Sequence, residues 1–324
     1  MPIAIVNPRS NSPLRLAAGK LIDSEGNVFP IVNGVARIAD LENYTESFGV
    51  QWNRFDKTQL DSERDGLALS YNRFFAETGW CPNDLAGKDI LEVGSGAGRF
   101  SRVVLEHTRA ELYSVDYSDA VSANFNNNGP IAPDRFQLFQ ASIYEMPFPD
   151  DSFDKVFCFG VLQHTPDFES SVRALISKTK PDGEVVVDFY SIKGWWTKLH
   201  AKYLLRPLTK RMSHEGLFKA IENNVDWLIE ASKLLRKIGL GVLTRFLPLV
   251  DLATIPINVL TKEQCREWVV LDTFDMFSPE HDHPQRIKDV VAMFTRNGAA
   301  VTFSGYVEFG GGLKAAVVRG IKEG

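Results

Sequence analysis

The segment DILEVGSGAGRF, residues 89–100, is the feature that most constrains the fold of this chain. It reads as a short apolar strand that ends in Glu92, followed by glycines at positions 94, 96 and 98 at the mouth of a helix. Glycine at such a turn lets bare backbone approach a ligand, and the amides of the turn need a partner. The segment therefore predicts a site for a nucleotide-type cofactor, and a tight structural turn is the alternative.

The residue that follows the glycines narrows the kind of cofactor. A dinucleotide fingerprint places its third glycine one residue further on, where the helix and the strand touch. Here that position is Arg99. The sequence thus argues against a dinucleotide.

The residues downstream predict a doubly wound α/β sheet. Residues 111–116 read as a second buried strand with Asp116 at its carboxyl end, which is beside the glycine loop in such a sheet. Asp116 could accept both hydroxyls of a ribose there, or could instead cap the helix that follows Asp119. Residues 136–139 and the almost wholly apolar run 155–160 read as a third and a fourth strand.

In this order and spacing, residues 85–190 resemble a class I S-adenosylmethionine-dependent methyltransferase of the small-molecule, type 11-like branch. The resemblance implies a Rossmann-like seven-stranded sheet with helices on both faces. It rests on the glycine loop, Asp116, "MPFPDDSFD" at 146–154, "GVLQHTPD" at 160–167 and "KPDGEVVV" at 180–187.

The resemblance also implies which residues bind S-adenosylmethionine. Ser142 departs from the family, which usually has an aspartate there to receive the adenine amino group, and a hydroxyl contributes less than a carboxylate. The implied contacts are Gly94, Ser95 and Gly96 to the methionine part, Glu92 near its ammonium group, Asp116 to the ribose and Tyr117 against the adenine, together with Ser142, Ile143 and Gly160.

Composition favours a cytoplasmic enzyme. With 324 residues, 44% of them hydrophobic, the chain can bury a sizeable core. A net charge of -5 gives no general attraction to nucleic acid, so no nucleic-acid partner is expected. Three cysteines without a Cys-x-x-Cys pair suit a reducing compartment, and neither a signal peptide nor an apolar run of membrane-spanning length is expected.

The first forty residues are predicted to form a small β-rich unit. The run 29–38 resembles the end of a zinc-ribbon-like domain, but the places of its cysteines carry Asn7, Ser10, Ile22 and Glu25 or their neighbours, so no metal site is expected. The predicted units are 1–40 for this segment, 41–84 for a helical cap, 85–190 for the core, 191–295 for a helical insertion after the fifth strand, and 296–324 for the last strands.

The cap contains a stretch, "FGVQWNRF" at 48–55, that relatives also carry ahead of the core. Such a segment can close over the cofactor, because aromatic rings attract a sulfonium as they attract other cations. The alternative is that Phe48, Trp52 and Phe55 only dock the segment by hydrophobic contact. Residues 64–79 have helical apolar spacing.

The insertion is predicted to build a lid on the substrate side. Residues 195–206 mix basic and aromatic side chains at helical spacing, and Lys210 and Arg211 extend the charge. A peripheral membrane contact through 193–211, an anionic-substrate surface and a solvated helix all fit this pattern. The run 234–260 could contact lipid or form a helical hairpin. Residues 299–306 and 312–319 are candidates for the sixth and seventh strands.

Three histidines are candidates for a general base. His164 ends the fourth strand, and His281 and His283 lie in "LDTFDMFSPEHDHPQ" at 271–285, which is interpreted as a substrate-side loop. A hydroxyl acceptor needs its proton removed, typically by histidine or a carboxylate. The alternatives are that His164 bonds its own turn and that His281 and His283 form a polar turn or a metal site.

We therefore expect a methyltransferase that acts on a hydroxyl or amine of a small molecule, such as a sugar, a lipid-linked compound or a secondary metabolite. The alternatives are a cofactor-binding partner subunit that does not catalyse, and a methyltransferase of protein or RNA. The sequence leaves the acceptor and the oligomeric state open.

Overall fold

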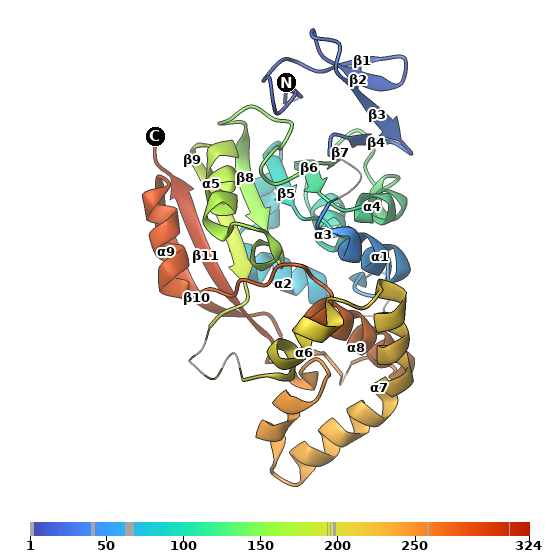
Figure 1. The fold of residues 1–324 in the computed structure, drawn as a ribbon. Coiled ribbons are helices and arrows are strands. Elements are labelled where there is room, and N and C mark those ends of the chain that lie inside the picture. The colour runs from blue at the N-terminus through green and yellow to red at the C-terminus, as the bar shows by residue number, and fades with distance from the viewer. Residues whose placement is uncertain are drawn as a thin grey trace.

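The computed structural model describes residues 3–39, 43–61, 68–192, 194, 196, 199–257, 259–310 and 312–324. The described residues form one sheet of eleven strands in the order β1-β2-β3-β4-β7-β6-β5-β8-β9-β11-β10, with helices on both faces (Figure 1). The six strands from β4 to β9 in this order are parallel, and the strands at either end are antiparallel. The expected doubly wound α/β class is confirmed.

The core sheet follows the boundaries predicted for its first strands. Residues 111–116 form β6 as expected, and the stretch "KPDGEVVV" at 180–187 lies within β9, which begins at Thr179. The strands of the core are β5 (Asp89–Val93), β6 (Glu111–Asp116), β7 (Phe136–Gln140), β8 (Phe153–Cys158), β9 (Thr179–Phe189), β10 (Ala299–Glu308) and β11 (Lys314–Lys322).

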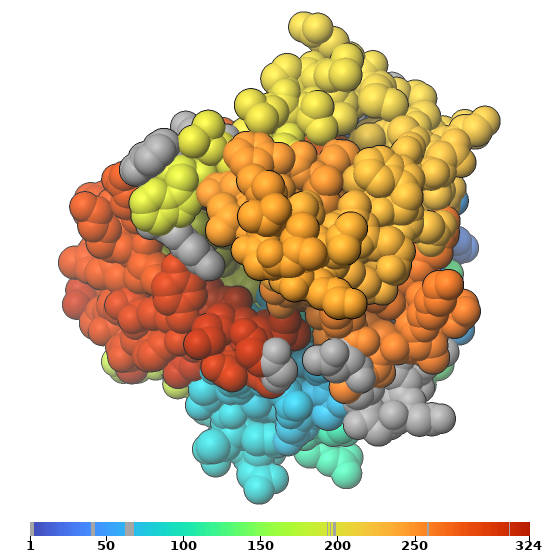
Figure 2. Space-filling model, turned by 90° about the horizontal axis from the view of Figure 1, so that it is seen from below, coloured from blue at the N-terminus to red at the C-terminus, as the bar shows by residue number. Residues whose placement is uncertain are grey.

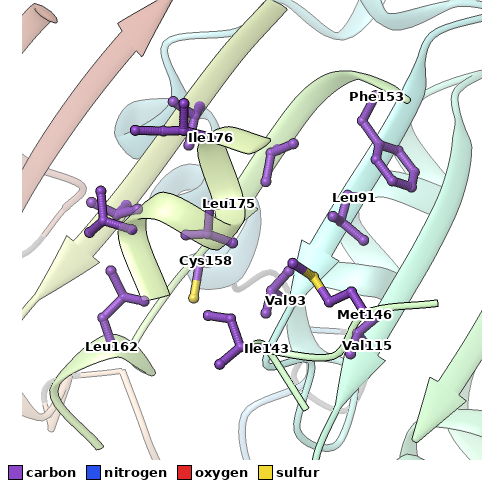
Figure 3. Packing of buried hydrophobic residues seen from close by; sticks show 14 of the residues in the cluster. Leu91, Val93, Val115, Ile143, Met146, Phe153, Cys158, Leu162, Leu175 and Ile176 are labelled. Atoms are coloured by element: carbon purple, nitrogen blue, oxygen red, sulfur yellow. The ribbon is translucent and has the colours of Figure 1, made fainter. Parts of the chain in front are cut away.

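The central strands of the core, such as β5 and β8, are buried on both sides because helices cover both faces. Ile90 and Leu91, neighbours in β5, are both fully buried, each in a different apolar cluster. One face packs against α2 (Leu69–Thr78), α3 (Arg99–His107) and α4 (Ala120–Asn128), and the other against α5 (Phe168–Lys178) and α9 (Ile287–Arg296). Figure 3 shows the apolar cluster on the face covered by α5 and α9, in which Cys158 and Met146 lie among aliphatic side chains.

The N-terminal unit extends the core sheet. Its strands are β1 (Arg15–Ala17), β2 (Lys20–Ile22), β3 (Val28–Val32) and β4 (Val35–Arg37), and β4 pairs in parallel with β7. In place of a metal, Asp23 holds the turn together, because Asn7 Nδ2 donates to its Oδ2 at 2.7 Å and Asn27 Nδ2 donates at 2.8 Å. Ahead of these strands, Val6 forms an isolated antiparallel bridge with Pro13. The likeness to a zinc ribbon stays a prediction, as do the unit boundaries.

The insertion is helical, but its helices lie elsewhere than predicted. The run 234–260 contains only the end of α7 and two short 3-10 helices, because Gly239 turns the chain with φ +79° and Pro248 and Pro256 follow. The antiparallel partner of α7 is instead α8. The insertion consists of α6 (Ala201–Thr209), α7 (His214–Lys237), η5 (Gly241–Phe246), η6 (Leu252–Thr254) and α8 (Lys262–Phe277).

Part of the predicted helix 195–206 lies outside the described residues, which include neither Lys193 nor Trp195. The helix begins at Ala201, where His200 caps it by accepting from the Lys202 amide at 3.2 Å. Within the described residues, no helix combines the length and apolar character needed to cross a membrane.

Candidate active site

A cavity of about 1250 Å³ opens at the carboxyl ends of β5, β6 and β8, where ligands bind in sheets of this kind. Its walls come from the loops after these strands, from α1 (Glu46–Arg54), from the insertion and from the turn between β10 and β11. Figure 2 shows a hollow between the insertion, in yellow and orange, and the red β10–β11 hairpin.

The glycine loop forms the floor of this cavity. Gly94, with φ +80°, lies so close to Val161 that a β-carbon on it would stand 2.2 Å from a methyl group. Gly96, with φ +52°, faces the indole of Trp52, and a β-carbon there would lie 3.2 Å from the indole Nε1. Both positions therefore need glycine for space as well as for backbone conformation.

Helix α1 lies across the loop. The ring of Phe48 is 5.2 Å from that of His164, and Phe55 packs against Phe218 of α7 at 5.8 Å. The segment thus joins the cofactor loop to the insertion, and hydrophobic docking and closure over the loop occur together. Its residues that line the cavity are Tyr44, Thr45, Phe48, Gln51, Trp52 and Phe55.

Asp116 binds the loop directly. Its Oδ2 accepts from the Gly96 amide at 2.8 Å, and its Oδ1 accepts from the Ser118 amide and hydroxyl at 2.8 and 2.6 Å. Helix α4 is capped through Ser118, whose hydroxyl accepts from the Ala120 amide, so Asp116 does not cap it directly. Burial raises the pKa of Asp116, which faces the cavity beside Tyr117.

Two buried polar atoms beside the loop have no hydrogen-bond partner among the described residues. They are the hydroxyl of Ser95 and the side-chain carbonyl oxygen of Gln51, in residues that are 6% and 1% exposed. Both residues line the cavity. A buried polar atom left unpaired is costly, so the geometry fits a polar ligand lying on the glycine loop.

Two of the predicted contacts do not reach the cavity. Glu92 is 1% exposed and lies below the loop, where Ser101 and Ser114 donate to its Oε2 and burial raises its pKa to about 7. The hydroxyl of Ser142 accepts from the Tyr144 amide at 3.2 Å. Neither residue lines the cavity, unlike Ile143 and Gly160.

The three candidate histidines lie near one another, but of the three only His164 lines the cavity. His164 lines the cavity and is 5% exposed, and its Nδ1 lies 3.1 Å from the backbone oxygen of His281. The rings of His281 and His283 stack on each other with centres 5.8 Å apart, and neither residue lines the cavity. In the described part of the chain, no group of three or more His, Cys, Asp or Glu side chains could hold a metal ion.

The wall that the insertion contributes to the cavity carries polar and charged side chains. Asp272 and Asp275 belong to α8, so the first half of the expected loop 271–285 is helical. The helix begins at a capping box formed by Thr261 and Gln264, and it ends ahead of Pro279. Tyr190 donates to Asp275 Oδ2 at 3.0 Å. Burial raises the pKa of Asp272 to about 7. Lys202 Nζ pairs with Asp282 at 2.8 Å and lies 4.9 Å from the centre of the Tyr190 ring.

Two arginines that were not predicted as site residues also line the cavity. Arg73 is neutralised by Glu77 and Asp188. Arg99 donates only to neutral groups, Ser70 Oγ at 2.8 Å and Gln59 at 3.1 Å, and makes no ion pair with the described residues. Burial lowers its pKa to about 9. Arg99 was noticed in the sequence only as a break in the glycine pattern.

Comparison with known proteins identifies the core. Residues 91–187 match a family described as methyltransferase domain. A tRNA U34 carboxymethyltransferase of Nautilia profundicola is 30% identical over 111 residues, which are 34% of this chain and 37% of that protein. A ubiquinone/menaquinone biosynthesis C-methyltransferase of Vibrio parahaemolyticus is 28% identical over 151 residues, 45% and 52% of the two chains. This chain thus spans about half or less of the length of these two relatives.

Among solved structures, magnesium protoporphyrin IX methyltransferase of Synechocystis PCC 6803 is similar with a TM-score of 0.46 and 14% identity, over 86% of this chain and 97% of that one. The family match covers β5 to β9, and these strands carry the glycine loop and Asp116. Residues 91–187 therefore carry a methyltransferase domain.

Proposed function

We propose that this chain transfers a methyl group from S-adenosylmethionine to a hydroxyl or amine of a small polar molecule. The observation that carries the proposal is the pair of unpartnered atoms, Ser95 Oγ and Gln51 Oε1, buried beside the glycine loop in a cavity that extends into a polar wall. The region beside the glycine loop suits the cofactor, and the region along the polar wall suits the acceptor.

The residues that would hold the cofactor lie on three elements. The loop after β5 offers its backbone and Ser95, the end of β6 offers Asp116, and α1 covers both with Trp52 and Phe48. Arg99 would pair with the carboxylate of the cofactor's amino-acid tail. When bound, S-adenosylmethionine supplies an activated methyl group on a cationic sulfur, and aromatic rings at the cavity wall favour such a cation.

His164 is suited to remove a proton from a hydroxyl acceptor. A carbonyl oxygen can only accept, so His164 Nδ1 carries the hydrogen that it donates to His281, and Nε2 retains its lone pair. Burial lowers the pKa of His164 below its ordinary value of 6.5, which keeps the ring neutral at pH 7. The acceptor proton would pass to Nε2 and then to solvent.

The polar wall favours an acceptor rich in hydroxyl or amino groups. Asp272 and Asp275 lie three residues apart on α8 and both face the cavity, with Tyr190 between them and His164. Carboxylates accept from hydroxyls and amines, and Lys202 and Tyr203 add donors to the same wall. A long apolar acceptor would bury these charged groups without offering them hydrogen bonds.

Calorimetry and a transfer assay test the proposal. The protein is titrated with S-adenosylmethionine, S-adenosylhomocysteine and NAD, and then incubated with methyl-labelled cofactor and panels of sugars, amines, tRNA and protein. We expect heat with the first two ligands only, and label on a small molecule. Heat with NAD alone would overturn the proposal, binding without transfer to any acceptor would favour a partner subunit, and label on tRNA or protein would replace the acceptor class.

A further inference from the structure

The insertion exposes an unusual amount of apolar surface. Of 21 large hydrophobic side chains exposed among the described residues, 14 lie between positions 196 and 259, a fifth of the chain. Scattered exposed hydrophobic residues are normal, but a gathering of them marks an interaction surface. The densest part, called here the apolar tip, consists of Leu234, Ile238, Leu240, Val242, Leu243 and Phe246, which are 44% to 75% exposed.

The apolar tip is the uncovered side of an otherwise packed element. Helix α7 buries Phe218 and Val225 against α8, whereas Leu234 and Ile238 follow one another by four residues on its outer side. The chain then turns back, with the Leu240 amide donating to Leu235 at 2.8 Å, and η5 packs on the end of α7. A second exposed pair, Leu204 and Leu208, is likewise four residues apart on α6.

The part of the insertion between residues 196 and 259 is opposite in charge to the rest of the chain. Residues 196–259 contain ten Lys and Arg against five Asp and Glu, while the remainder contains 26 against 36. Between residues 231 and 250 there are four cations, Lys233, Arg236, Lys237 and Arg245, and no acidic residue. Lys233 and Arg236 make exposed ion pairs, which contribute little, and Lys237 makes none with the described residues.

We infer that the apolar tip docks on an anionic lipid bilayer. Exposed Leu, Val and Phe side chains interleaved with Lys and Arg suit the boundary between acyl chains and negative headgroups. A second copy of the chain fits less well, because pairing this surface with itself would bring like charges together. Docking there would place the cavity, which Thr254 and Pro256 of the insertion help to line, close to the membrane surface.

Vesicle sedimentation tests this inference without any methyl transfer, so its outcome is separate from that of the proposed function. The full chain is mixed with vesicles of phosphatidylcholine, with and without phosphatidylglycerol. The test variant is Val242→Ser with Phe246→Ser, which are 75% and 49% exposed. The control is Leu16→Ser with Val28→Ser in the N-terminal unit, which are similarly exposed at 69% and 49%.

We expect binding only to the vesicles with phosphatidylglycerol, weaker at high salt. The test variant should bind at least about tenfold more weakly and the control should bind like the parent protein. Lys233→Gln with Lys237→Gln should weaken binding about fivefold for each charge. The inference would be overturned if the parent protein does not sediment with vesicles, or if the control variant loses as much binding as the test variant. It would also be overturned if the parent protein is a dimer and the test variant is a monomer. Unchanged affinity for S-adenosylhomocysteine shows that the variants are folded.

Discussion

The imidazole of His164 donates from Nδ1 to the backbone carbonyl of His281, 3.1 Å away and 117 residues later in the chain. The amide of His283 donates in turn to the backbone of Gln163 at 2.7 Å. The loop after α8 therefore fixes the ring of His164 against the cavity through its backbone, while its own two imidazoles stay outside. In this arrangement the backbones of His281 and His283 hold the turn that carries His164, and of the three histidines only His164 lines the cavity.

Replacing His164 should separate transfer from cofactor binding. We expect His164→Ala to lower kcat with a hydroxyl acceptor by about 10²- to 10⁴-fold, because the proton acceptor is lost, and to leave the Kd for S-adenosylhomocysteine nearly unchanged. His107→Ala is the matched control, since His107 lies at the end of α3 and does not line the cavity. Equal activity of the two variants would contradict a role for His164.

The pH dependence of the parent enzyme tests the same group. Only neutral His164 can accept a proton, and burial lowers its pKa below 6.5. The rate should rise with pH to a plateau, with its midpoint below 6.5. Because the unfolded chain binds the proton more tightly, the same shift stabilises the fold above pH 6.5, and this contribution is lost as the pH falls. A kcat profile from pH 4.5 to 8 that rises only above pH 7 would contradict this assignment.

The contact between Gly96 and Trp52 predicts a loss of cofactor affinity on adding one methyl group. Gly96→Ala places a β-carbon 3.2 Å from the indole, whereas Gly87→Ala meets no atom within 4 Å although its φ of +70° is equally left-handed. Both variants should lose about 1 kcal/mol of unfolding free energy. Calorimetry should show about a tenfold weaker Kd for S-adenosylhomocysteine in Gly96→Ala alone, and equal affinities would show that the loop does not hold the cofactor.

The sequence predicts the first four strands and the loop because local rules determine them. In residues 111–116 the neighbouring side chains of Leu112 and Tyr113 are buried on opposite faces of the sheet, and the glycines indicate the turn before any tertiary contact is known. The pairing of the loop with Trp52 was open, because it depends on how α1 lies across the sheet. The roles expected for Glu92 and Ser142 came from a family pattern, and their side chains turn toward Ser101, Ser114 and the Tyr144 amide instead.

The insertion was the hardest part to predict, since apolar spacing does not say which helices will pair. Residues 234–260 are apolar enough for a hairpin, yet Gly239 and two prolines break them into short turns. Asp272 and Asp275 were placed in a loop because they are polar, but they lie at the inner side of a capped helix. Arg99 could have been identified from the sequence as a cation beside a cofactor loop.

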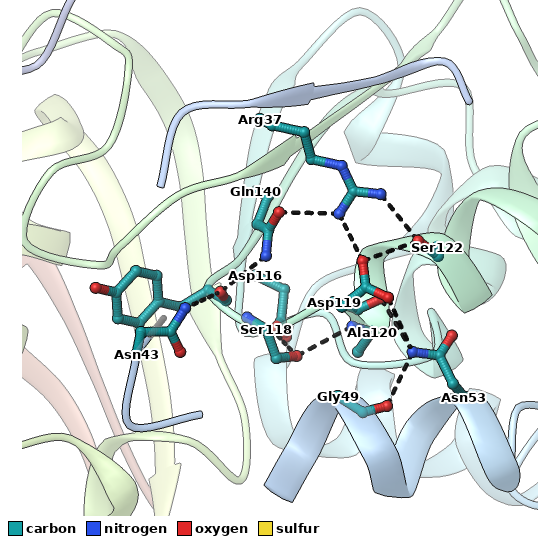
Figure 4. A network of polar contacts seen from close by, with 11 residues as sticks. Arg37, Asn43, Gly49, Asn53, Asp116, Ser118, Asp119, Ala120, Ser122 and Gln140 are labelled. Atoms are coloured by element: carbon teal, nitrogen blue, oxygen red, sulfur yellow. Dashed lines mark hydrogen bonds and ion pairs between the residues drawn. The ribbon is translucent and has the colours of Figure 1, made fainter. Parts of the chain in front are cut away.

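The contacts of Arg37 are expected to hold the N-terminal unit on the core sheet and so to contribute to the free energy of unfolding. From β4 its guanidinium donates to Asp119 and to Gln140 of β7, each at 2.9 Å (Figure 4). Arg37→Met should lower the unfolding free energy in urea by about 1–3 kcal/mol, because buried Gln140 loses its donor, whereas exposed Asp119 contributes little. Arg15→Met, at an exposed position in β1, should change it by less than about 0.5 kcal/mol. If both variants unfold like the parent, Arg37 does not hold the unit.

Arg99 predicts which end of the cofactor the chain recognises by charge. It is a buried cation at the start of α3, next to the glycine loop, and the described residues offer it no ion pair. A carboxylate on the ligand would supply one, and hydrogen bonds between charged groups are worth about 1.5–3 kcal/mol. Arg99→Gln should therefore bind S-adenosylhomocysteine about ten- to hundredfold more weakly.

Methylthioadenosine, which has the adenosine and sulfur but no amino-acid tail, is the control ligand for this variant. Its Kd should change less than about twofold in Arg99→Gln, because we expect the adenosine to contact Asp116 and Trp52 instead. A parallel loss for both ligands in calorimetry would instead mean that Arg99 supports the site through Ser70 and Gln59. Unchanged affinity for both ligands would indicate that Arg99 pairs with a negatively charged group of the acceptor instead. The expected difference between the two ligands assigns the guanidinium to the cofactor tail, since only a group that meets the carboxylate can tell them apart.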